Sequence, residues 1–281
     1  MAEVKAADVA KLRKLTGAGM MDCKKALQEN DGDFDAAKDW LRTKGLAGAT
    51  KRAGRAAEQG TVDVIADGNV GALVEVTCET DFVAKSSEFV ELVHDLTQMV
   101  FDQPNSGIEL NPFRDSTVGE VITQLGAKLG ENIALGRIAR FESADGIVDG
   151  YKHMQNNRGT IGVLVDLAGV EADDAKAREL AHDLALHIAS AAPRYLTRED
   201  VPADVVERER AVFEELTRNE GKPEQAWPKI IEGRLNGFYK ENVLLEQGFV
   251  KEPKTTIKSL VDGFGGGASI RQFIRVKIAE D

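Results

Sequence analysis

Apolar residues recur at helical spacing at the start of the chain. Val9, Leu12 and Leu15 share one face of the first of three predicted short helices. Glycines suit the left-handed conformation beyond a helix end, so Gly45 is predicted to end the third helix. We therefore predict a three-helix module over residues 1–46, a size that is typical of docking modules.

The next segment, residues 47–60, holds small and basic residues and has almost nothing to bury. Such a segment is best interpreted as a linker, which could contain a helical stretch. After this linker the helical spacing gives way to the alternation of apolar and polar residues that is typical of strands.

The rest of the chain contains an internal repeat. Gly-Ala-Leu-Val-Glu-Val at residues 71–76 is similar to Gly-Val-Leu-Val-Asp-Leu at 162–167, and Glu-Leu-Val-His-Asp-Leu at 91–96 is similar to Glu-Leu-Ala-His-Asp-Leu at 179–184. In each copy two predicted strands precede a predicted helix, which indicates a small antiparallel sheet covered by helices. The predicted elements are 61–67, 70–77 and 86–101 in the first copy, and 147–153, 160–168 and 173–192 in the second.

The predicted fold class is α+β. We expect a small three-helix, UBA-like module, then a first α+β subdomain at 61–140 and a second at 141–281, each with an antiparallel sheet. A helix in the first subdomain is predicted to end at Gly130. Residues 202–243 depart from the repeat, with an apolar stripe among many Glu and Arg residues that is interrupted at Gly221. We interpret this insertion as a helical hairpin (coiled coil) that could be solvated on one side, dimerise or meet a partner.

The link between strand and helix in the first copy places a large aromatic residue, Phe82, where a turn should be solvated. Such a residue either folds back into the core or faces a partner, and the stretch alone favours the core. The corresponding positions of the second copy, near 171–174, carry no aromatic residue. Because both copies would need an aromatic that completes their cores, the repeat favours an outward-facing Phe82 that anchors an interface.

Two adjacent methionines, Met20 and Met21, follow a Gly-Ala-Gly loop in the three-helix module. This position predicts that at least one of them faces outward, and thioethers adapt well to a partner surface. The alternative is that both side chains fill gaps in the core of the module.

Composition narrows the choice of partners and compartment. Of the 281 residues, 42% are hydrophobic and 30% are charged, as in an ordinary globular protein. The net charge of −11 argues against a protein that binds nucleic acid. The first 57 residues nevertheless carry 12 Lys and Arg against 8 Asp and Glu, which suits an acidic protein partner. No leader, membrane span or cysteine motif is found, so we expect a cytoplasmic protein without a membrane partner.

No motif for a chemical step stands out. The glycine-rich stretch 263–267 lacks the Lys-Ser/Thr pair of a phosphate loop, so we expect the chain to bind no nucleotide of its own. The histidines match neither a nucleophile nor a metal-ligand pattern, and the correspondence of His182 with His94 favours a structural role common to both copies. Asp81 has no candidate partner acid nearby. We therefore expect no catalytic residue, no metal and no cofactor.

Five motifs carry a resemblance to a known family. Leu-Arg-x-x-Thr-Gly-Ala-Gly-Met-Met-Asp-Cys-Lys-Lys-Ala-Leu at 12–27 and Thr-Asp-Phe-Val at 80–83 are the most specific. Gly-Glu-Asn-Ile at 130–133, His-Ile-Ala at 187–189 and Glu-Gly-Arg at 232–234 follow in the same order. Over essentially the whole chain, these motifs resemble bacterial elongation factor Ts.

The resemblance implies a translation elongation factor that acts as a guanine-nucleotide exchange factor for the GTPase elongation factor Tu. In the family the amino-terminal module docks on the GTPase domain. A tip enters between two helices near the nucleotide, displaces Mg²⁺ and distorts the phosphate loop. The resemblance places these partner contacts at Arg13, Met20, Met21 and Lys24, at Thr80, Asp81, Phe82 and Val83, and at Leu129, Gly130 and His153. Many members continue into a further carboxy-terminal helix, which we expect this chain to lack.

One hypothesis from another class stays open. The three-helix module could belong to a docking or scaffold protein that binds a helical or ubiquitin-like partner without altering its activity. Release of GDP from elongation factor Tu separates the two hypotheses, because only an exchange factor accelerates it.

Overall fold

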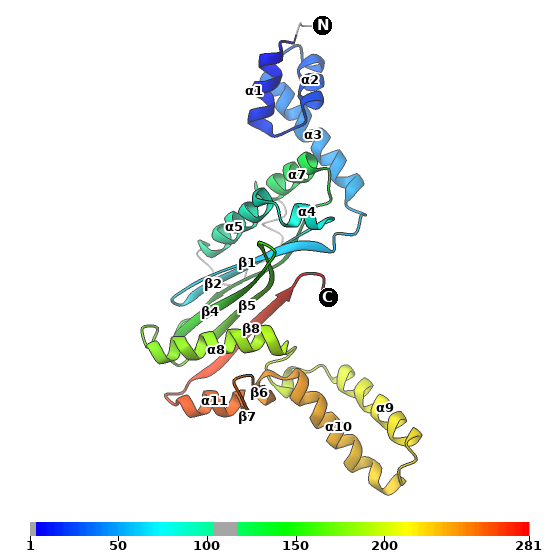
Figure 1. Ribbon diagram of the computed structural model, residues 1–281, viewed down its shortest axis with the longest axis vertical. Coiled ribbons are helices and arrows are strands. Elements are labelled where there is room, and N and C mark those ends of the chain that lie inside the picture. The colour runs from blue at the N-terminus through cyan, green and yellow to red at the C-terminus, as the bar shows by residue number, and fades with distance from the viewer. Residues whose placement is uncertain (1–3, 104–116, 281) are drawn as a thin grey trace.

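The amino-terminal module consists of three helices. In the computed structural model, which describes residues 4–103 and 117–280, these are α1 (Ala6–Thr16), α2 (Met20–Glu29) and α3 (Phe34–Arg52) (Figure 1). The left-handed Gly17, with a φ of 68°, ends α1. The helices enclose a core made of Val9, Leu12, Cys23, Ala26, Leu27, Ala37 and Leu41. The UBA-like character of the module stays a prediction.

The prediction that the third helix ends at Gly45 is wrong. Helix α3 continues to Arg52, so the first part of the expected linker is helical and only residues 53–58 form an irregular link to the first sheet. A Cβ atom on Gly45 would stand 3.8 Å from the Cβ of Ala127 on α7 (Thr117–Leu129), so the glycine lies where two helices cross. Packing against α7 stabilises α3 beyond its local preference. The predicted division into domains stays a proposal.

Each copy of the repeat forms a three-stranded antiparallel sheet. In both sheets the central strand pairs with the strand before it and with the last strand of its copy. The outer face of each sheet is covered by two helices, which bury one hydrophobic core per copy. The first copy contains β1 (Gln59–Asp67), β2 (Val70–Cys78), α4 (Asp81–Ala84), α5 (Ser87–Phe101), α7 and β3 (Ala134–Glu142). The second contains β4 (Gly146–Gln155), β5 (Arg158–Ala168), α8 (Ala175–Ala191), α11 (Ile257–Phe264) and β8 (Ser269–Lys277).

The two sheets pack face to face, so the body of the molecule has helix, sheet, sheet and helix layers (Figure 1). Matching glycines make room for this contact. A Cβ on Gly71 would come within 2.6 Å of the Val148 side chain, and a Cβ on Gly162 would come within 2.6 Å of the Val62 side chain. Gly71 corresponds to Gly162 in the repeat, and the registers of the two hairpins make Val62 correspond to Val148. The contact is therefore pseudo-twofold, as between two subunits of a symmetric dimer.

Two acids in each copy have equivalent partners, and all but Asp149 are buried. Asp63 on β1 pairs with His94 at 2.8 Å, and Asp149 on β4 pairs with His182 at 3.5 Å. His182 and His94 thus have equivalent partners in the two copies, and the structural role that the sequence predicts for them stays a prediction. Glu75 and Asp166 lie on the central strands where the third strand of each sheet carries a β-bulge, and they bind arginines of that third strand. These arginines are Arg137 in the first copy and Arg271 in the second.

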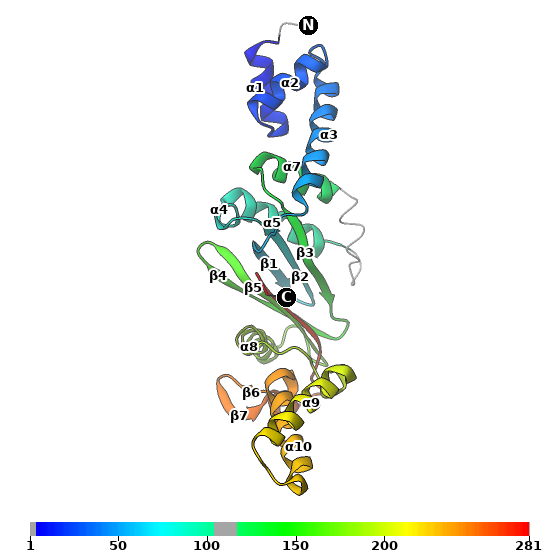
Figure 2. The same ribbon diagram turned by 90° about the vertical axis from the view of Figure 1, so that its right-hand side faces the viewer.

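The insertion in the second copy is a helical hairpin of α9 (Ala203–Asn219) and α10 (Trp227–Asn242). Figures 1 and 2 show that it projects from the end of the molecule opposite the three-helix module. Its coiled-coil packing stays a prediction. The remaining elements are the short strands β6 (Gly248–Phe249) and β7 (Glu252–Thr256) and the 3-10 helices Arg198–Asp200, Glu224–Ala226 and Leu244–Glu246.

A buried polar network joins the base of the hairpin to the second sheet unit. His187 of α8 lies within 3.0 Å of the Gln247 side-chain oxygen, and its Nδ1 accepts a hydrogen bond from the backbone N–H of Val250. Gln247 in turn donates to the carbonyl oxygens of Ala191 and Glu241. Because Nδ1 is an acceptor, the proton of the neutral ring lies on Nε2 and is donated to Gln247.

Candidate functional site

The side chain of Phe82 faces solvent at the tip between β2 and α5. It is 85% exposed, the largest exposed fraction among the large hydrophobic side chains of the described residues. Phe82 lies on the single-turn helix α4, whose N-cap is Thr80: the threonine hydroxyl accepts a hydrogen bond from the backbone N–H of Val83. Val83 is half-buried against the first core and Ala84 is buried, so α4 is anchored on one side and presents the phenyl ring on the other.

Glu131 holds the tip in place from the loop that follows α7. One of its carboxylate oxygens accepts hydrogen bonds from the backbone N–H groups of Glu79 and Thr80, each at 3.1 Å. The other oxygen accepts from the hydroxyl of Thr80. Glu131 was not among the site residues predicted from the sequence, although it lies in the Gly-Glu-Asn-Ile motif at 130–133.

A second set of contacts ties the same loop to the end of β2. Glu79 accepts a hydrogen bond from the backbone N–H of Asn132 at 2.6 Å and pairs with Arg55 at 3.3 Å. Gly130, with a φ of 75°, ends α7 as expected and places its carbonyl oxygen 3.4 Å from Arg55. Leu129 packs against the first core. The structure therefore brings the predicted Leu129 and Gly130 beside the predicted tip.

Asp81 lies next to Phe82 and is half-exposed. Its carboxylate pairs with Lys85 one helical turn later, at 2.6 Å. Thr80, and not Asp81, is the N-cap of α4. The hydrogen bond from Lys85 lowers the pKa of Asp81 below its ordinary value, with a smaller contribution from the charge of Arg158. At neutral pH the tip therefore presents a carboxylate beside an aromatic ring.

The predicted contacts of the three-helix module form a second exposed group. Met20 is 56% exposed and Met21 73%, so the alternative that both fill the core is wrong. Both follow Gly19 in the first turn of α2, and Arg13 and Lys24 are exposed as well. Figure 2 shows α1, α4 and the β4–β5 hairpin along one side of the molecule.

His153, the last predicted contact, is an exposed residue of β4. Its Nδ1 lies 3.1 Å from the hydroxyl of Tyr151. The structure thus distributes the predicted residues over three places: the three-helix module, the tip with its neighbouring loop, and the end of β4.

Neither a metal site nor a membrane span is found in the described part of the chain. No group of three or more His, Cys, Asp or Glu side chains there is arranged to hold a metal ion. No helix in residues 4–103 and 117–280 is long and apolar enough to cross a bilayer. Burial raises the pKa of the Cys78 thiol to about 12, which leaves it protonated and unreactive at neutral pH.

Comparison with known proteins covers almost the whole chain. Residues 79–280 match the family model described as elongation factor TS, and residues 1–48 match the model for the amino-terminal part of mitochondrial elongation factor Ts. The chain is 45% identical over 283 residues to an elongation factor Ts from Micrococcus luteus, with 99% of both chains covered. It is 47% identical over 287 residues to the elongation factor Ts from Thermobifida fusca, with 100% of both chains covered. The identity to an elongation factor Ts from Mycobacterium tuberculosis is 46% over 285 residues, again with 100% of both chains covered.

Proposed function

The chain belongs to the elongation factor Ts family of translation elongation factors, and from this membership we propose that it promotes the release of guanine nucleotide from the GTPase elongation factor Tu. The proposal gives the chain no chemical step of its own, because it acts by binding its partner. The expected setting is the cytoplasm, where translation takes place.

The observation that carries the proposal is the exposed Phe82 on a fixed tip. Transfer of a phenyl ring from water into an apolar slot on a partner lowers the free energy, and aromatic anchors of this kind dominate interface energetics. Thr80 and Glu131 already hold the backbone of the tip through hydrogen bonds. Little conformational entropy is then lost on binding, so more of the contact energy remains to distort the partner.

Asp81 adds a carboxylate, paired with Lys85, beside the wedge. The Mg²⁺ and phosphate sites of a GTPase depend on fixed geometry and on a balance of charge. We infer that the tip, with Leu129 and Gly130 alongside, enters between two helices of the GTPase near these sites. A ring that moves the helices apart and a carboxylate close to the cation together favour loss of the Mg²⁺ and distortion of the phosphate loop.

The three-helix module supplies a second contact in this proposal. Met20 and Met21 offer adaptable apolar surface, flanked by the exposed cations Arg13 and Lys24. Docking of this module on the GTPase domain makes entry of the tip effectively intramolecular, which raises its effective concentration. His153 at the end of β4 is proposed as a further contact.

The thermodynamics of exchange follow from linkage. If the chain binds the nucleotide-free GTPase more tightly than the GDP-bound form, it must weaken GDP binding by the same factor. A binding protein with no catalytic group therefore suffices for the activity.

The test is the rate at which labelled GDP leaves elongation factor Tu. The unmodified chain is expected to accelerate release strongly, and Phe82→Ala is expected to reduce the acceleration by about 30-fold or more, since loss of an aromatic anchor costs about 2 kcal/mol or more. The matched control is Val250→Ala, which removes a side chain that is 43% exposed on another part of the surface.

Two outcomes would count against the proposal. No acceleration by the unmodified chain would favour a docking or scaffold protein instead of an exchange factor. Acceleration that survives Phe82→Ala would keep the exchange activity and remove Phe82 as its wedge.

A further inference from the structure

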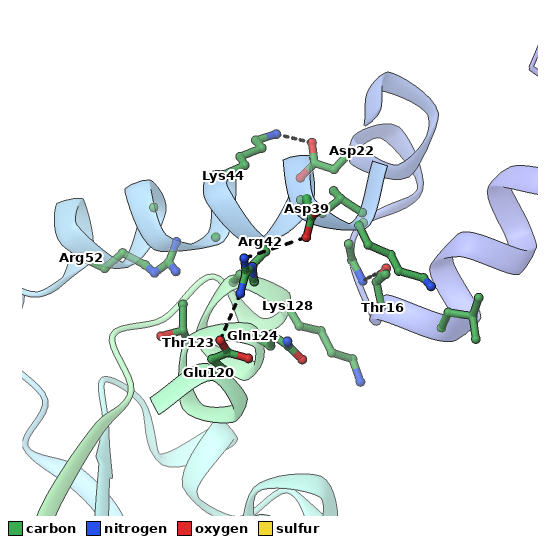
Figure 3. Close-up of a pocket in the computed structure, with 18 residues that line it drawn as sticks. Thr16, Asp22, Asp39, Arg42, Lys44, Arg52, Glu120, Thr123, Gln124 and Lys128 are labelled. Carbon is green, nitrogen blue, oxygen red and sulfur yellow. Dashed lines mark hydrogen bonds and ion pairs between the residues drawn. The ribbon is translucent and has the colours of Figure 1, made fainter. Parts of the chain in front are cut away.

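A cleft of about 370 Å³ lies between the three-helix module and α7 (Figure 3). Its walls come from the loop between α1 and α2, from one side of α3 and from the facing side of α7. The proposed partner contacts at the tip do not line it. The volume is that of a small-molecule site, and such sites often lie where two structural units meet.

One arginine of this cleft has N–H groups without a partner. The Nε and Nη2 atoms of Arg52 are buried and make no hydrogen bond within residues 4–103 and 117–280. A buried donor without an acceptor costs about 1–3 kcal/mol, and more when it is charged, so its retention calls for a compensating ligand. The other basic residues of the cleft differ from Arg52 in being paired with acids: Lys38 with Asp35, Arg42 with Glu120, Lys44 with Asp22 and Lys128 with Glu88.

The guanidinium of Arg52 has room because of a glycine on its own helix. A Cβ atom on Gly48, one turn earlier on α3, would stand 2.9 Å from Nη1 of Arg52. Gly126 of α7 faces the same group from the other side, at 3.8 Å.

The rest of the lining suits a molecule with one charged and one apolar end. Leu15, which is 60% exposed, and Leu41 provide apolar surface on the side of the three-helix module. Of the five basic side chains that line the cleft, four are paired with acids, so among the described residues Arg52 is the cation left to hold an anion there.

We propose that this cleft binds a small organic anion, with its charged group on Arg52 and its apolar body against Leu15 and Leu41. The cleft has α3 on one side and α7 on the other, so a ligand inside it would fix the three-helix module relative to the tip that carries Phe82. The binding itself does not depend on the function proposed above.

The test uses two fluorescent probes of similar shape, anilinonaphthalene sulfonate and the uncharged phenylnaphthylamine, titrated into the full chain. The sulfonate is expected to bind at one saturable site, and Arg52→Gln is expected to weaken it by about tenfold or more, as loss of a charge-assisted hydrogen bond does. Arg52→Gln should leave the affinity for the uncharged probe unchanged. Arg210→Gln, on the exposed surface of α9, is the matched control.

A second pair of variants keeps the test decisive if Arg52→Gln does not fold. Gln124 is an exposed residue of the cleft, so Gln124→Glu adds a negative charge without disturbing the core, and Gln124→Ala controls for the lost amide. Only the glutamate variant should weaken binding of the sulfonate. Equal affinity of the sulfonate for the unmodified chain, Arg52→Gln and Gln124→Glu would overturn the proposal, as would equal losses for both probes. Because elongation factor Tu is absent from these titrations, their outcome is independent of the exchange assay.

Discussion

Glu131 binds three groups of the tip with a single carboxylate: the backbone N–H of Glu79, and the backbone N–H and hydroxyl of Thr80. At this scale the side chains with a proposed functional role face outward or hold a neighbour that does. Phe82, Met20 and Met21 could be predicted because an apolar residue stood where the local pattern called for a polar one. Glu131 could not, since its partners, two backbone N–H groups and one hydroxyl, are far along the chain and only the fold brings them close.

Replacing Glu131 should release the tip without unfolding the chain. We expect Glu131→Ala to lower the acceleration of GDP release while costing about 1.5–3 kcal/mol of stability, the range for hydrogen bonds to a charged group. Glu131→Gln keeps one acceptor oxygen and should lose less activity. Exchange assays and chemical denaturation on the same samples separate the two effects. Full exchange activity in Glu131→Ala would show that the wedge works without a fixed backbone.

Stability should fall on acidification because of His187. Burial lowers the pKa of this histidine below its ordinary 6.5 in the folded chain, while the hydrogen bond to Gln247 opposes that shift in part. Above about pH 6.5 the ring is neutral in both the folded and the unfolded chain, so its contribution to the free energy of unfolding is fully present. Below that pH the unfolded chain binds a proton first, so the free energy of unfolding decreases by up to about 1.4 kcal/mol per pH unit.

Denaturant unfolding between about pH 7.5 and about pH 5.5 checks the role of His187. His187→Asn should show a smaller loss of stability over this range than the unmodified chain, whatever its stability at neutral pH. The matched control is His153→Asn, which removes an exposed histidine. An unchanged pH dependence in His187→Asn would assign the effect to other groups.

At the scale of elements, periodicity located the strands and helices of both copies closely. The strand expected at 70–77 is β2 (Val70–Cys78), and the helix expected at 173–192 is α8 (Ala175–Ala191). Helix α3 was misjudged because a glycine that ends an isolated helix can also mark a place where two helices cross. Local propensity favours the first interpretation, and contact with α7 decides for the second.

Two glycines of the three-helix module, Gly45 and Gly17, should respond oppositely to substitution by alanine. Gly45 is helical and its Cβ would meet Ala127 at an ordinary 3.8 Å, so Gly45→Ala should stabilise the chain by about 0.4–1 kcal/mol. Gly17 has a φ of 68°, so Gly17→Ala should destabilise it by about 1 kcal/mol or more. Chemical denaturation measures both. A destabilising Gly45→Ala would mean that α3 and α7 approach more closely than described.

At the scale of the whole molecule, the sequence predicted two sheet units but not how they meet. The repeat shows that each copy has the same elements, whereas the contact between the copies depends on which faces are left after helices cover the others. Gly71 and Gly162 were visible in the sequence as members of the repeat. Their role emerges only in the assembled molecule, where each faces a valine of the other copy.

Alanine at either glycine should separate the sheets. A Cβ on Gly71 or on Gly162 would come within 2.6 Å of its neighbour, so each substitution should destabilise the chain by about 1–3 kcal/mol, the usual cost of overpacking. The two losses should be similar, because the positions are equivalent. The control is Gly233→Ala on α10, where a Cβ meets nothing within 4 Å. Differential scanning calorimetry should find a lower melting temperature for the first two variants only.

The pseudo-twofold contact between the sheets also bears on how the two copies of the repeat could come to carry different residues at their tips. Two separate copies of such a unit would form a homodimer with two identical tips, and every substitution would appear in both. Covalent linkage keeps the copies at a high effective concentration for each other, so the pairing survives while the halves acquire different residues. One tip carries the exposed Phe82, and the corresponding segment of the other carries the acids Glu171, Asp173 and Asp174. A symmetric scaffold thereby presents an asymmetric face.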